Sequence, residues 1–138
     1  MPNSEDVLDM HRLLLAIGSN VNHTKNVALS KQFLSERFER IQFSKELYTE
    51  PLGDTTSGNK YVNLLAVCLT DLSYDRVIAT LKQIERACGD TCTLRKEGKV
   101  VMDIDLLEYD MQRYHIADWQ RQYIIELMQS FKQIISEY

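Results

Sequence analysis

The sequence predicts an α+β fold in which helices pack on one face of an antiparallel sheet. Three observations predict it. Short apolar runs recur along the chain, two stretches between them have apolar residues at helical spacing, and the order is strand, helix, strand, strand, helix, strand. A third stretch with helical spacing follows at the C-terminal end. The 138 residues, 44% of them hydrophobic, predict a single domain with an ordinary core.

The first half of the chain contains a predicted strand, helix and strand. We expect residues 1–10, which are polar and acidic, to form a loose arm. Residues 12–17 are a continuous apolar run, typical of a central strand, and a Gly-Ser-Asn turn ends it. Helical spacing over 24–38 follows, with Thr24 or Asn22 as its candidate N-cap. Residues 41–48 alternate loosely and predict a second strand.

The second half begins with a functional loop candidate. Residues 49–59 are the longest stretch of turn residues, and a loop of that length inside a domain is usually functional. A strongly apolar strand is expected over 61–69, a helix over 73–88 with Ser73 as N-cap, and a polar loop over 90–99. A strand over 99–110 and an amphipathic helix over 118–138, capped by Asp118, complete the order.

The strand over 99–110 carries the D-x-D motif, which is the candidate metal site. Alternation places Asp103 and Asp105 on one face, opposite the apolar set that begins at Val100. Two anions on one strand face repel each other, and a divalent cation with oxygen ligands, such as Mg²⁺, removes that repulsion. The alternative is a strand whose second face is exposed to solvent. Glu85 faces the buried side of its helix, so it must be paired, hydrated or near a metal.

Charge and cysteine content exclude several classes of protein. A net charge of −4 argues against a nucleic-acid or anionic-membrane surface. No apolar run approaches the ~20 residues of a membrane span, and the acidic N-terminus does not resemble a signal peptide, so we expect a cytoplasmic protein. The three cysteines are expected to be reduced thiols. Cys88 and Cys92 could be two zinc ligands, but no nearby pair completes a zinc site.

The predicted order β-α-β-β-α-β is that of the split βαβ, or ferredoxin-like, fold, here with an additional C-terminal helix. In that topology the first and fourth strands are neighbours. The turn at 18–20 and the D-x-D motif would therefore border one cleft.

Five short motifs on these elements resemble one known family. They are AIGSN at 16–20, YTEPLG at 48–53, KYVN at 60–63, QIE at 83–85 and MDIDLL at 102–107. In this order, over about residues 12–127, they resemble the hydroxymethyl-dihydropterin pyrophosphokinases of folate biosynthesis. The resemblance implies Mg²⁺-dependent transfer of pyrophosphate from ATP to the hydroxymethyl group of a reduced pterin, which releases AMP.

The resemblance also implies roles for particular residues. Asp103 and Asp105 would hold two Mg²⁺ ions together with ATP. The pterin pocket would be formed by Thr49, Pro51, Leu52, Tyr61, Asn63 and Tyr123. The nucleotide would contact Lys82, Glu85, Leu106, His115 and Arg121. Without the resemblance, the same side chains would be interpreted as residues at the edge of the core, polar residues on a strand or surface residues.

The sequence departs from the family pattern at several positions. Val100 stands where the family has an arginine, and Asp90 where a basic residue is common. The loop instead offers Arg95, Lys96 and Lys99 as candidate catalytic cations. Tyr114 replaces the proline before the histidine at 115, and the chain finishes its helix where the family continues with further strands. Fewer arginines around a pyrophosphoryl group would weaken charge stabilisation and reduce activity.

Three hypotheses therefore follow from the sequence. The first is the active pyrophosphokinase with ATP and hydroxymethyl-dihydropterin as its partners. The second is a paralogue with weak or no turnover that serves as a ligand-binding or interaction domain. The third is another Mg²⁺-nucleotide enzyme that uses the same carboxylates. We expect a monomer, with the C-terminal helix as a candidate interaction surface.

Overall fold

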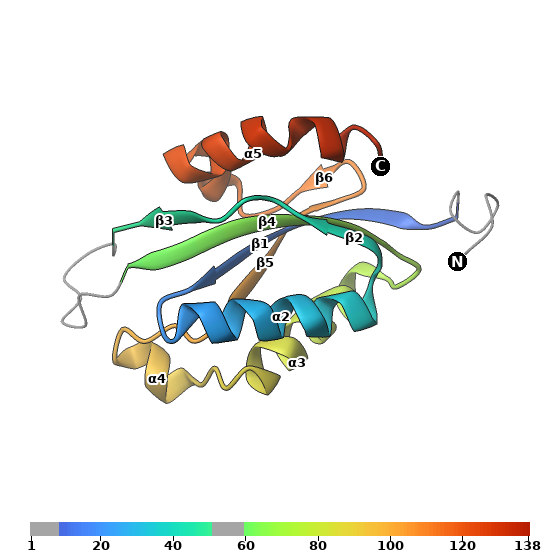
Figure 1. Cartoon of the computed structure of the whole chain (residues 1–138). Helices are drawn as coiled ribbons and strands as arrows, with labels where there is room; N and C mark the ends of the chain where they lie inside the picture. The colour runs from blue at the N-terminus through green and yellow to red at the C-terminus, as the bar shows by residue number, and fades with distance from the viewer. Residues whose placement is uncertain (1–8, 51–59) are drawn as a thin grey trace.

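The chain folds into a central sheet with helices on both faces (Figure 1). The computed structural model describes residues 9–50 and 60–138. The strands are β1 (His11–Ser19), β2 (Glu39–Phe43), β3 (Leu47–Thr49), β4 (Tyr61–Thr70), β5 (Asp103–Tyr109) and β6 (Gln112–Arg113). The helices are α2 (His23–Arg37), α3 (Tyr74–Ala87), α4 (Cys92–Lys96), the 3₁₀-helix η1 (Ile116–Gln120) and α5 (Gln122–Ile135). None of the helices in this described part is long and apolar enough to span a bilayer.

The sheet confirms the predicted α+β topology. Its strand order is β2-β4-β1-β5-β6, with β3 also paired to β4, and each of these pairs is antiparallel. The first strand, β1, pairs with β5, which carries the D-x-D motif, as the ferredoxin-like order requires. Gly18 lies opposite Asp103 in that pair, so the glycine turn and the carboxylates meet at one end of the sheet.

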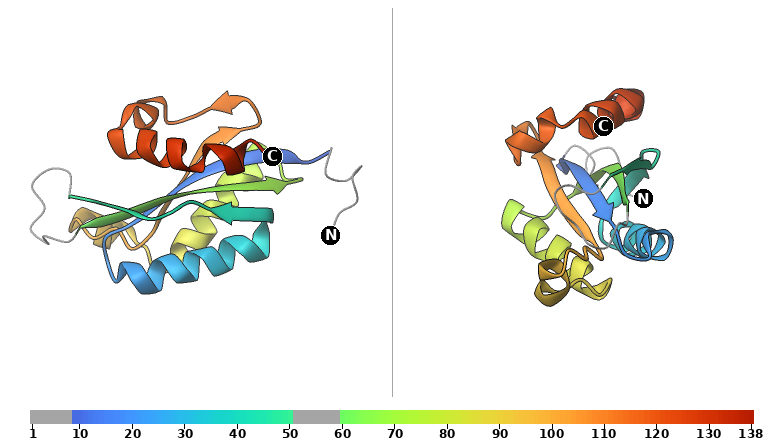
Figure 2. Two further views of the ribbon diagram at one scale, coloured as in Figure 1. Left: turned by 45° about the horizontal axis from the view of Figure 1, so that its top comes forward. Right: turned by 90° about the vertical axis from the view of Figure 1, so that its left-hand side faces the viewer.

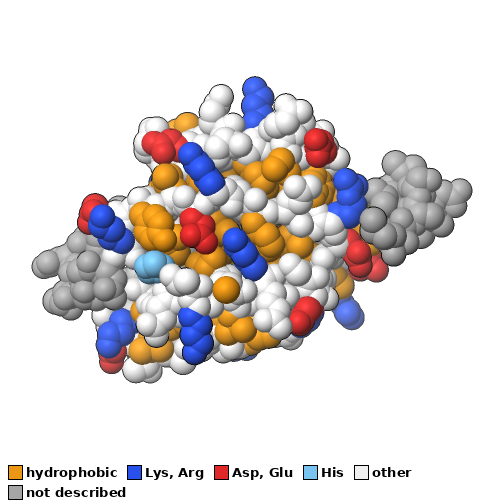
Figure 3. Space-filling view, viewed as in Figure 1, with side chains coloured by type: hydrophobic (Ala, Val, Ile, Leu, Met, Phe, Trp, Pro, Cys, Tyr) orange, Lys and Arg blue, Asp and Glu red, His pale blue; other side chains and the backbone are white. Residues whose placement is uncertain are grey.

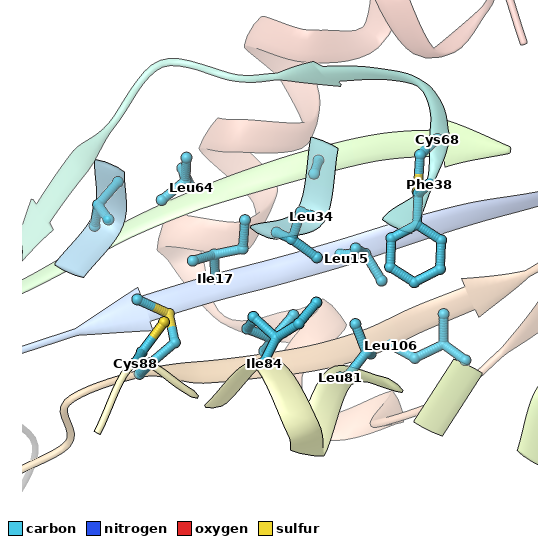
Figure 4. Packing of buried hydrophobic residues seen from close by; sticks show 14 of the residues in the cluster. Leu15, Ile17, Leu34, Phe38, Leu64, Cys68, Leu81, Ile84, Cys88 and Leu106 are labelled. Atoms are coloured by element: carbon cyan, nitrogen blue, oxygen red, sulfur yellow. The ribbon is translucent and has the colours of Figure 1, made fainter. Parts of the chain in front are cut away.

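Helices cover both faces of the sheet, which corrects the expectation of one covered face. On one face, β1, β4 and β5 pack against α2 and α3, with Leu15, Leu34 and Ile84 among the buried residues (Figure 4). On the other face, α5 buries Ile124, Leu127 and Phe131 against the same strands. The three layers are seen end-on in Figure 2. The face of the D-x-D strand that was expected to be open is thus partly covered by α5.

The single strand predicted over 41–48 is two strands, because a serine interrupts it. Phe43 pairs with Ala66 in β2 and Leu47 pairs with Asn63 in β3, so one strand has an extra residue between these pairs. At the interruption, the Ser44 hydroxyl accepts the Leu65 N–H at 2.8 Å. The extra residue makes this a β-bulge, and a side-chain oxygen takes the place of a strand carbonyl there.

The strand predicted from residue 99 begins only at Asp103. The backbone N–H groups just before it donate to side chains, not to a neighbouring strand: Val100 to Asn20 Oδ1 at 2.7 Å, and Val101 to Asp90 Oδ1 at 3.1 Å. The preceding polar loop also contains a short helix, α4, because the Thr91 hydroxyl accepts the Leu94 N–H at 3.1 Å and caps its first turn.

The C-terminal helix begins later than predicted, and Asp118 does not cap it. Asp118 lies within η1 and pairs with Arg121, whose Nε lies 2.9 Å from Asp118 Oδ1. Trp119 Nε1 donates to the Tyr114 carbonyl at 3.0 Å, which fixes the 3₁₀ turn ahead of α5. At α2 the side chain of the N-cap residue, Asn22, makes no capping hydrogen bond, and its backbone is left-handed, with φ 41°. Ser73 caps α3 as predicted.

Candidate functional site

Two cavities meet at the D-x-D end of β5. Asp103 and Asp105 line both of them, the first on the α5 side of the sheet and the second on the α3 side. Alternation along β5 brings the two carboxylates to one face, and pairing with Gly18 and Ala16 of β1 fixes their position. Side-chain exposures of 38% for Asp103 and 30% for Asp105 leave both reachable by a ligand.

The first cavity, of about 250 Å³, is lined by small residues of one strand and by aromatic side chains. Ala16 and Gly18 of β1 lie on the floor, and a methyl group built at Gly18 would lie 3.6 Å from the Asn63 side-chain oxygen. Tyr61 at the start of β4 and Tyr123 at the start of α5 also line it. Small side chains on the strand leave room for a flat ligand beside the rings.

The polar groups of the first cavity are held in place. Asn63 is buried on β4, and its Nδ2 donates to the Thr49 hydroxyl at 2.9 Å and to the Leu47 carbonyl at 3.3 Å. Burial and the nearby charges of Asp103 and Asp118 raise the pKa values of Tyr61 and Tyr123, respectively. Both phenols therefore remain hydrogen-bond donors at neutral pH. A heterocycle with its own donors and acceptors would find oriented partners here.

The second cavity, of about 590 Å³, has more basic residues in its lining than the first, beside four carboxylates. Lys82, Arg86 and Arg95 line it, with apolar contacts from Ile78, Leu81 and Leu106. His115 lies at the side toward η1. Basic groups beside an apolar wall suit a ligand with a charged and a flat apolar part. On the face of the molecule seen in Figure 3, by comparison, acidic and basic side chains are interspersed.

The carboxylates between the cavities repel each other. Burial, the charge of Asp103 and a hydrogen bond with it raise the pKa of Asp105 to about 7. Burial also raises the pKa of Glu85, although its Oε2 accepts the Ile104 N–H at 2.7 Å. The unfavourable interaction among these groups is relieved by positive charge. Oxygen donors alone, in a partly exposed position, are the ligands that Mg²⁺ prefers, so Asp103 and Asp105 fit that ion.

Arg95 of α4 is the cation nearest to Asp103 among the described residues. Its Nε lies 2.5 Å from Asp90 Oδ2, and its Nη2 lies 3.0 Å from the Met102 carbonyl and 3.3 Å from Asp103 Oδ1. Burial lowers the pKa of Arg95, but the hydrogen bond to Asp90 and the surrounding carboxylates outweigh it and raise that pKa. The guanidinium therefore stays charged beside the D-x-D motif.

Asp118 joins the site although it was predicted only as a helix cap. His115 lies between two carboxylates, with Nε2 3.9 Å from Asp105 Oδ1 and Nδ1 4.0 Å from Asp118 Oδ2. One ligand atom from each of these three residues lies within 4.8 Å of the others, a spacing that could hold a metal ion. The three-residue spacing of His115, Asp118 and Arg121, which places them on one side of a helical turn, is the sequence signal for this group.

Most of the predicted site residues lie at the two cavities. Thr49, Tyr61, Asn63 and Tyr123 line the first cavity, and Lys82, Glu85, Leu106 and His115 line the second. Arg121, which was expected beside the nucleotide, lines the first cavity. Lys96 and Lys99 line neither of these two cavities, and Lys99 Nζ lies 3.4 Å from Glu97 Oε2. Pro51 and Leu52 lie outside the described residues.

Comparisons with known proteins identify one family. A family model described as 7,8-dihydro-6-hydroxymethylpterin-pyrophosphokinase (HPPK) matches residues 14–133. No curated protein matches the chain significantly. Among solved structures, the aminopeptidase PepT from Bacillus cereus ATCC 10987 matches with 11% identity and a TM-score of 0.32. The match covers 91% of this chain and 35% of PepT, and a likeness at this level supports no conclusion about function.

Proposed function

Because this chain belongs to the 7,8-dihydro-6-hydroxymethylpterin-pyrophosphokinase family, we propose that it transfers pyrophosphate from ATP to a hydroxymethyl-dihydropterin. In this reaction the pterin hydroxyl oxygen bonds to the β-phosphorus of ATP. The bond from that phosphorus to the oxygen bridging to the α-phosphate breaks, AMP leaves with the bridging oxygen, and the hydroxyl proton is released to solvent. Positioning and charge neutralisation supply most of the catalysis that such a transfer needs.

One observation carries the proposal: the two carboxylates of β5 line both cavities. A transfer between two substrates requires their reacting ends to meet at one place. A pterin in the first cavity and a triphosphate in the second would meet at Asp103 and Asp105. We propose that these two residues hold the Mg²⁺ ions that accompany ATP. When bound, the ions would neutralise phosphate charge. The raised pKa of Asp105 supports this assignment, because burial and the charge of Asp103 disfavour the anion, and a bound cation would favour it.

The first cavity is the proposed pterin pocket. Tyr123 would stack on the ring system, and Tyr61 would line the same pocket. Asn63 and Thr49 would contact the donors and acceptors of the ring. The hydrogen bond between these two side chains, at 2.9 Å, orients them. Pro51 and Leu52 belong to the proposed pocket through the family resemblance alone.

The second cavity is the proposed nucleotide pocket. Leu106 would contact the adenine, and Lys82 and His115 would contact the phosphates or sugar. Glu85 accepts the Ile104 N–H at 2.7 Å and would help to hold β5 in place beside the nucleotide. Arg121 would approach the phosphates from the pterin side, because it lines the first cavity.

The positive charge at the transferred phosphates would come from the loop before β5. We propose Arg95 as the principal cation, since its Nη2 lies 3.3 Å from Asp103 Oδ1. Lys96 and Lys99 would add charge from the same loop at a greater distance. With Val100 contributing no charge, we expect turnover to be reduced relative to a site with more arginines.

Release of AMP tests the proposed function. The purified chain is incubated with ATP and Mg²⁺, with and without hydroxymethyl-dihydropterin, and AMP is measured by a coupled assay. AMP that forms only with the pterin supports the proposal. Saturable pterin binding without turnover would instead identify a binding domain on the same fold, and pterin-independent turnover another Mg²⁺-nucleotide enzyme.

We further propose that the chain acts as a monomer. The buried face of α5 packs on the sheet of its own chain through Leu127 and Phe131, while Ile125 on its outer face is 47% exposed. That outer face is the proposed interaction surface. Light scattering of the purified chain at several concentrations checks the oligomeric state; a mass of two chains would contradict it. The cytoplasmic location stays a prediction.

A further inference from the structure

Asp90 is a buried carboxylate at the end of α3 to which the proposed reaction gives no role. It is 9% exposed, and its two oxygens have separate partners. Oδ1 accepts the N–H groups of Val101 and Met102 at 3.1 and 3.3 Å. Oδ2 accepts the Nε–H of Arg95 at 2.5 Å. One carboxylate thus joins the arginine of α4 to the backbone directly before Asp103.

The contact with Asp90 determines where the Arg95 guanidinium lies. Arg95 is on a helix of only five residues and is partly exposed, so its long side chain would otherwise sample many rotamers. With Nε held by Asp90, the planar guanidinium directs Nη2 to the Met102 carbonyl at 3.0 Å and to Asp103 Oδ1 at 3.3 Å. A second carboxylate, Glu85, lies 3.8 Å from the same nitrogen.

We propose that Asp90 is a positioning residue, which holds Arg95 at the edge of the second cavity beside Asp103. This inference rests on the proposed function. Arg95, so held, meets the charge of the phosphates that are transferred, and Asp90 acts on turnover only through Arg95. A carboxylate at this position would oppose catalysis if it faced the phosphates itself, but both of its oxygens are engaged by donors of the chain.

The two oxygens of Asp90 allow the positioning role to be separated from a structural one. Asp90→Asn can keep an oxygen on the Val101 and Met102 N–H groups while it places an amide group against Arg95 Nε, where two donors now face each other. We expect kcat to fall about 10- to 100-fold, since a misplaced catalytic group has effects of this size. The KM for the pterin should change less than twofold, and Asp90→Glu should recover part of the turnover.

Glu108→Gln is the matched control. Glu108 is likewise a buried carboxylate that pairs with an arginine, Arg12, but it lies at the other end of β5. This variant should lose as much thermal stability as Asp90→Asn and keep kcat within twofold below its melting temperature. If both variants lower kcat equally, the effect is one of stability and the proposal is wrong.

A double-mutant cycle tests whether Asp90 acts through Arg95. We expect Asp90→Asn to slow the Arg95→Ala variant by less than twofold, because the group that Asp90 positions is already absent. Independent, multiplicative losses would overturn the proposal. The same cycle is measured for binding of Mg²⁺ with a non-hydrolysable ATP analogue, so that it can be read even if the chain proves to lack turnover.

The contact itself is tested by NMR of the arginine Nε–H groups, with the Arg95 signal assigned by its loss in Arg95→Ala. We expect a slowly exchanging signal in the parent and in Glu108→Gln, and its loss in Asp90→Asn. An unchanged signal in Asp90→Asn would overturn the proposal. Absence of AMP release from the parent would overturn the proposed function alone, because neither the signal nor analogue binding depends on turnover.

Discussion

Single side chains determine how the D-x-D end of β5 responds to pH. The folded state raises the pKa of Asp105 to about 7, through burial and the charge of Asp103, whereas an aspartate in the unfolded chain titrates near its ordinary value of 3.8. Between these values the folded state keeps a proton that the unfolded state has lost. The free energy of unfolding should therefore fall as the pH rises from about 4 to about 7, and stay lowered above that range.

Asp105→Asn should remove the fall in the free energy of unfolding between about pH 4 and pH 7. Without Mg²⁺ at pH 8 we expect the melting temperature of the variant to exceed that of the parent by a few degrees, and at pH 4 the two to melt alike. Mg²⁺ should stabilise the parent and not the variant. Glu46→Gln, which removes an exposed carboxylate, is the control and should match the parent at both pH values. A variant that is less stable at pH 8 would mean that Asp105 is a structural residue.

The three loop cations should differ in importance. Arg95 lines the second cavity, and Lys96 and Lys99 line neither of the two cavities at the D-x-D motif. We expect Arg95→Ala to lower turnover by roughly 100- to 1,000-fold, the range for removal of one stabilising donor. Lys96→Ala and Lys99→Ala should have smaller effects, and pterin affinity should change little in all three. Steady-state kinetics of AMP release measures the turnover of each variant. Equal losses of turnover for the three variants would contradict the prediction that Arg95 matters most.

The Asn20 side chain helps to hold the loop from Asp90 to Lys99 at the end of β1, beside a backbone hydrogen bond from the Asn20 N–H to the Val100 carbonyl at 2.9 Å. Asn20 is buried, donates from Nδ2 to the Gly98 carbonyl at 3.0 Å and accepts the Val100 N–H at 2.7 Å. We expect Asn20→Ala to accelerate amide exchange over residues 98–100 and to weaken binding of an ATP analogue more than binding of the pterin. Hydrogen exchange with mass spectrometry, together with separate titrations of the two ligands, measures both effects.

Asn26→Ala is the control for this prediction. Asn26 is also buried, but its Nδ2 donates to the Val21 carbonyl at the start of α2. Its loss should lower the melting temperature and leave exchange over 98–100 unchanged. If Asn20→Ala leaves that exchange at the parent rate, α4 and its flanking residues are held by other contacts.

The two helical layers of the molecule should support the two cavities separately. Phe131 of α5 is buried on the face that carries the first cavity, and Leu34 of α2 is buried on the opposite face. Phe131→Ala and Leu34→Ala should each lower the free energy of unfolding by about 2–5 kcal/mol. Only Phe131→Ala should also weaken pterin binding by more than its effect on nucleotide binding, since Tyr123 and Ile124 of α5 line the first cavity.

Denaturant unfolding and ligand titrations below the melting temperature check this difference. Leu34→Ala is the matched control, because it removes a buried side chain of similar cost from the other layer. Equal losses of pterin affinity in the two variants would show that the cavities are not supported by separate layers.

Continuous apolar runs predicted β1 and β4, helical spacing of apolar residues predicted α2 and α3, and the order of these elements predicted the topology of the sheet. These patterns extend over many residues, so local sequence determines the elements. The errors lie where a side chain replaces a backbone partner. Ser44 interrupts the second strand by accepting the Leu65 N–H, and Asp90 and Asn20 take the N–H groups that would otherwise extend β5. No repeat in the sequence reports such contacts, because their partners are distant in the chain.

The sequence by itself determined the chemistry of the site: two carboxylates on one strand face, a glutamate on the inward side of α3, and tyrosines and an asparagine around them. Only the tertiary structure decided their arrangement. It packs α5 on the face of the sheet that was expected to be open, so the D-x-D carboxylates lie between two cavities. It also brings Asp118 to His115 and directs Arg95, through Asp90, to Asp103. Charge and hydrogen-bonding capacity belong to a residue type, whereas the distance between two side chains depends on the packing of every layer between them.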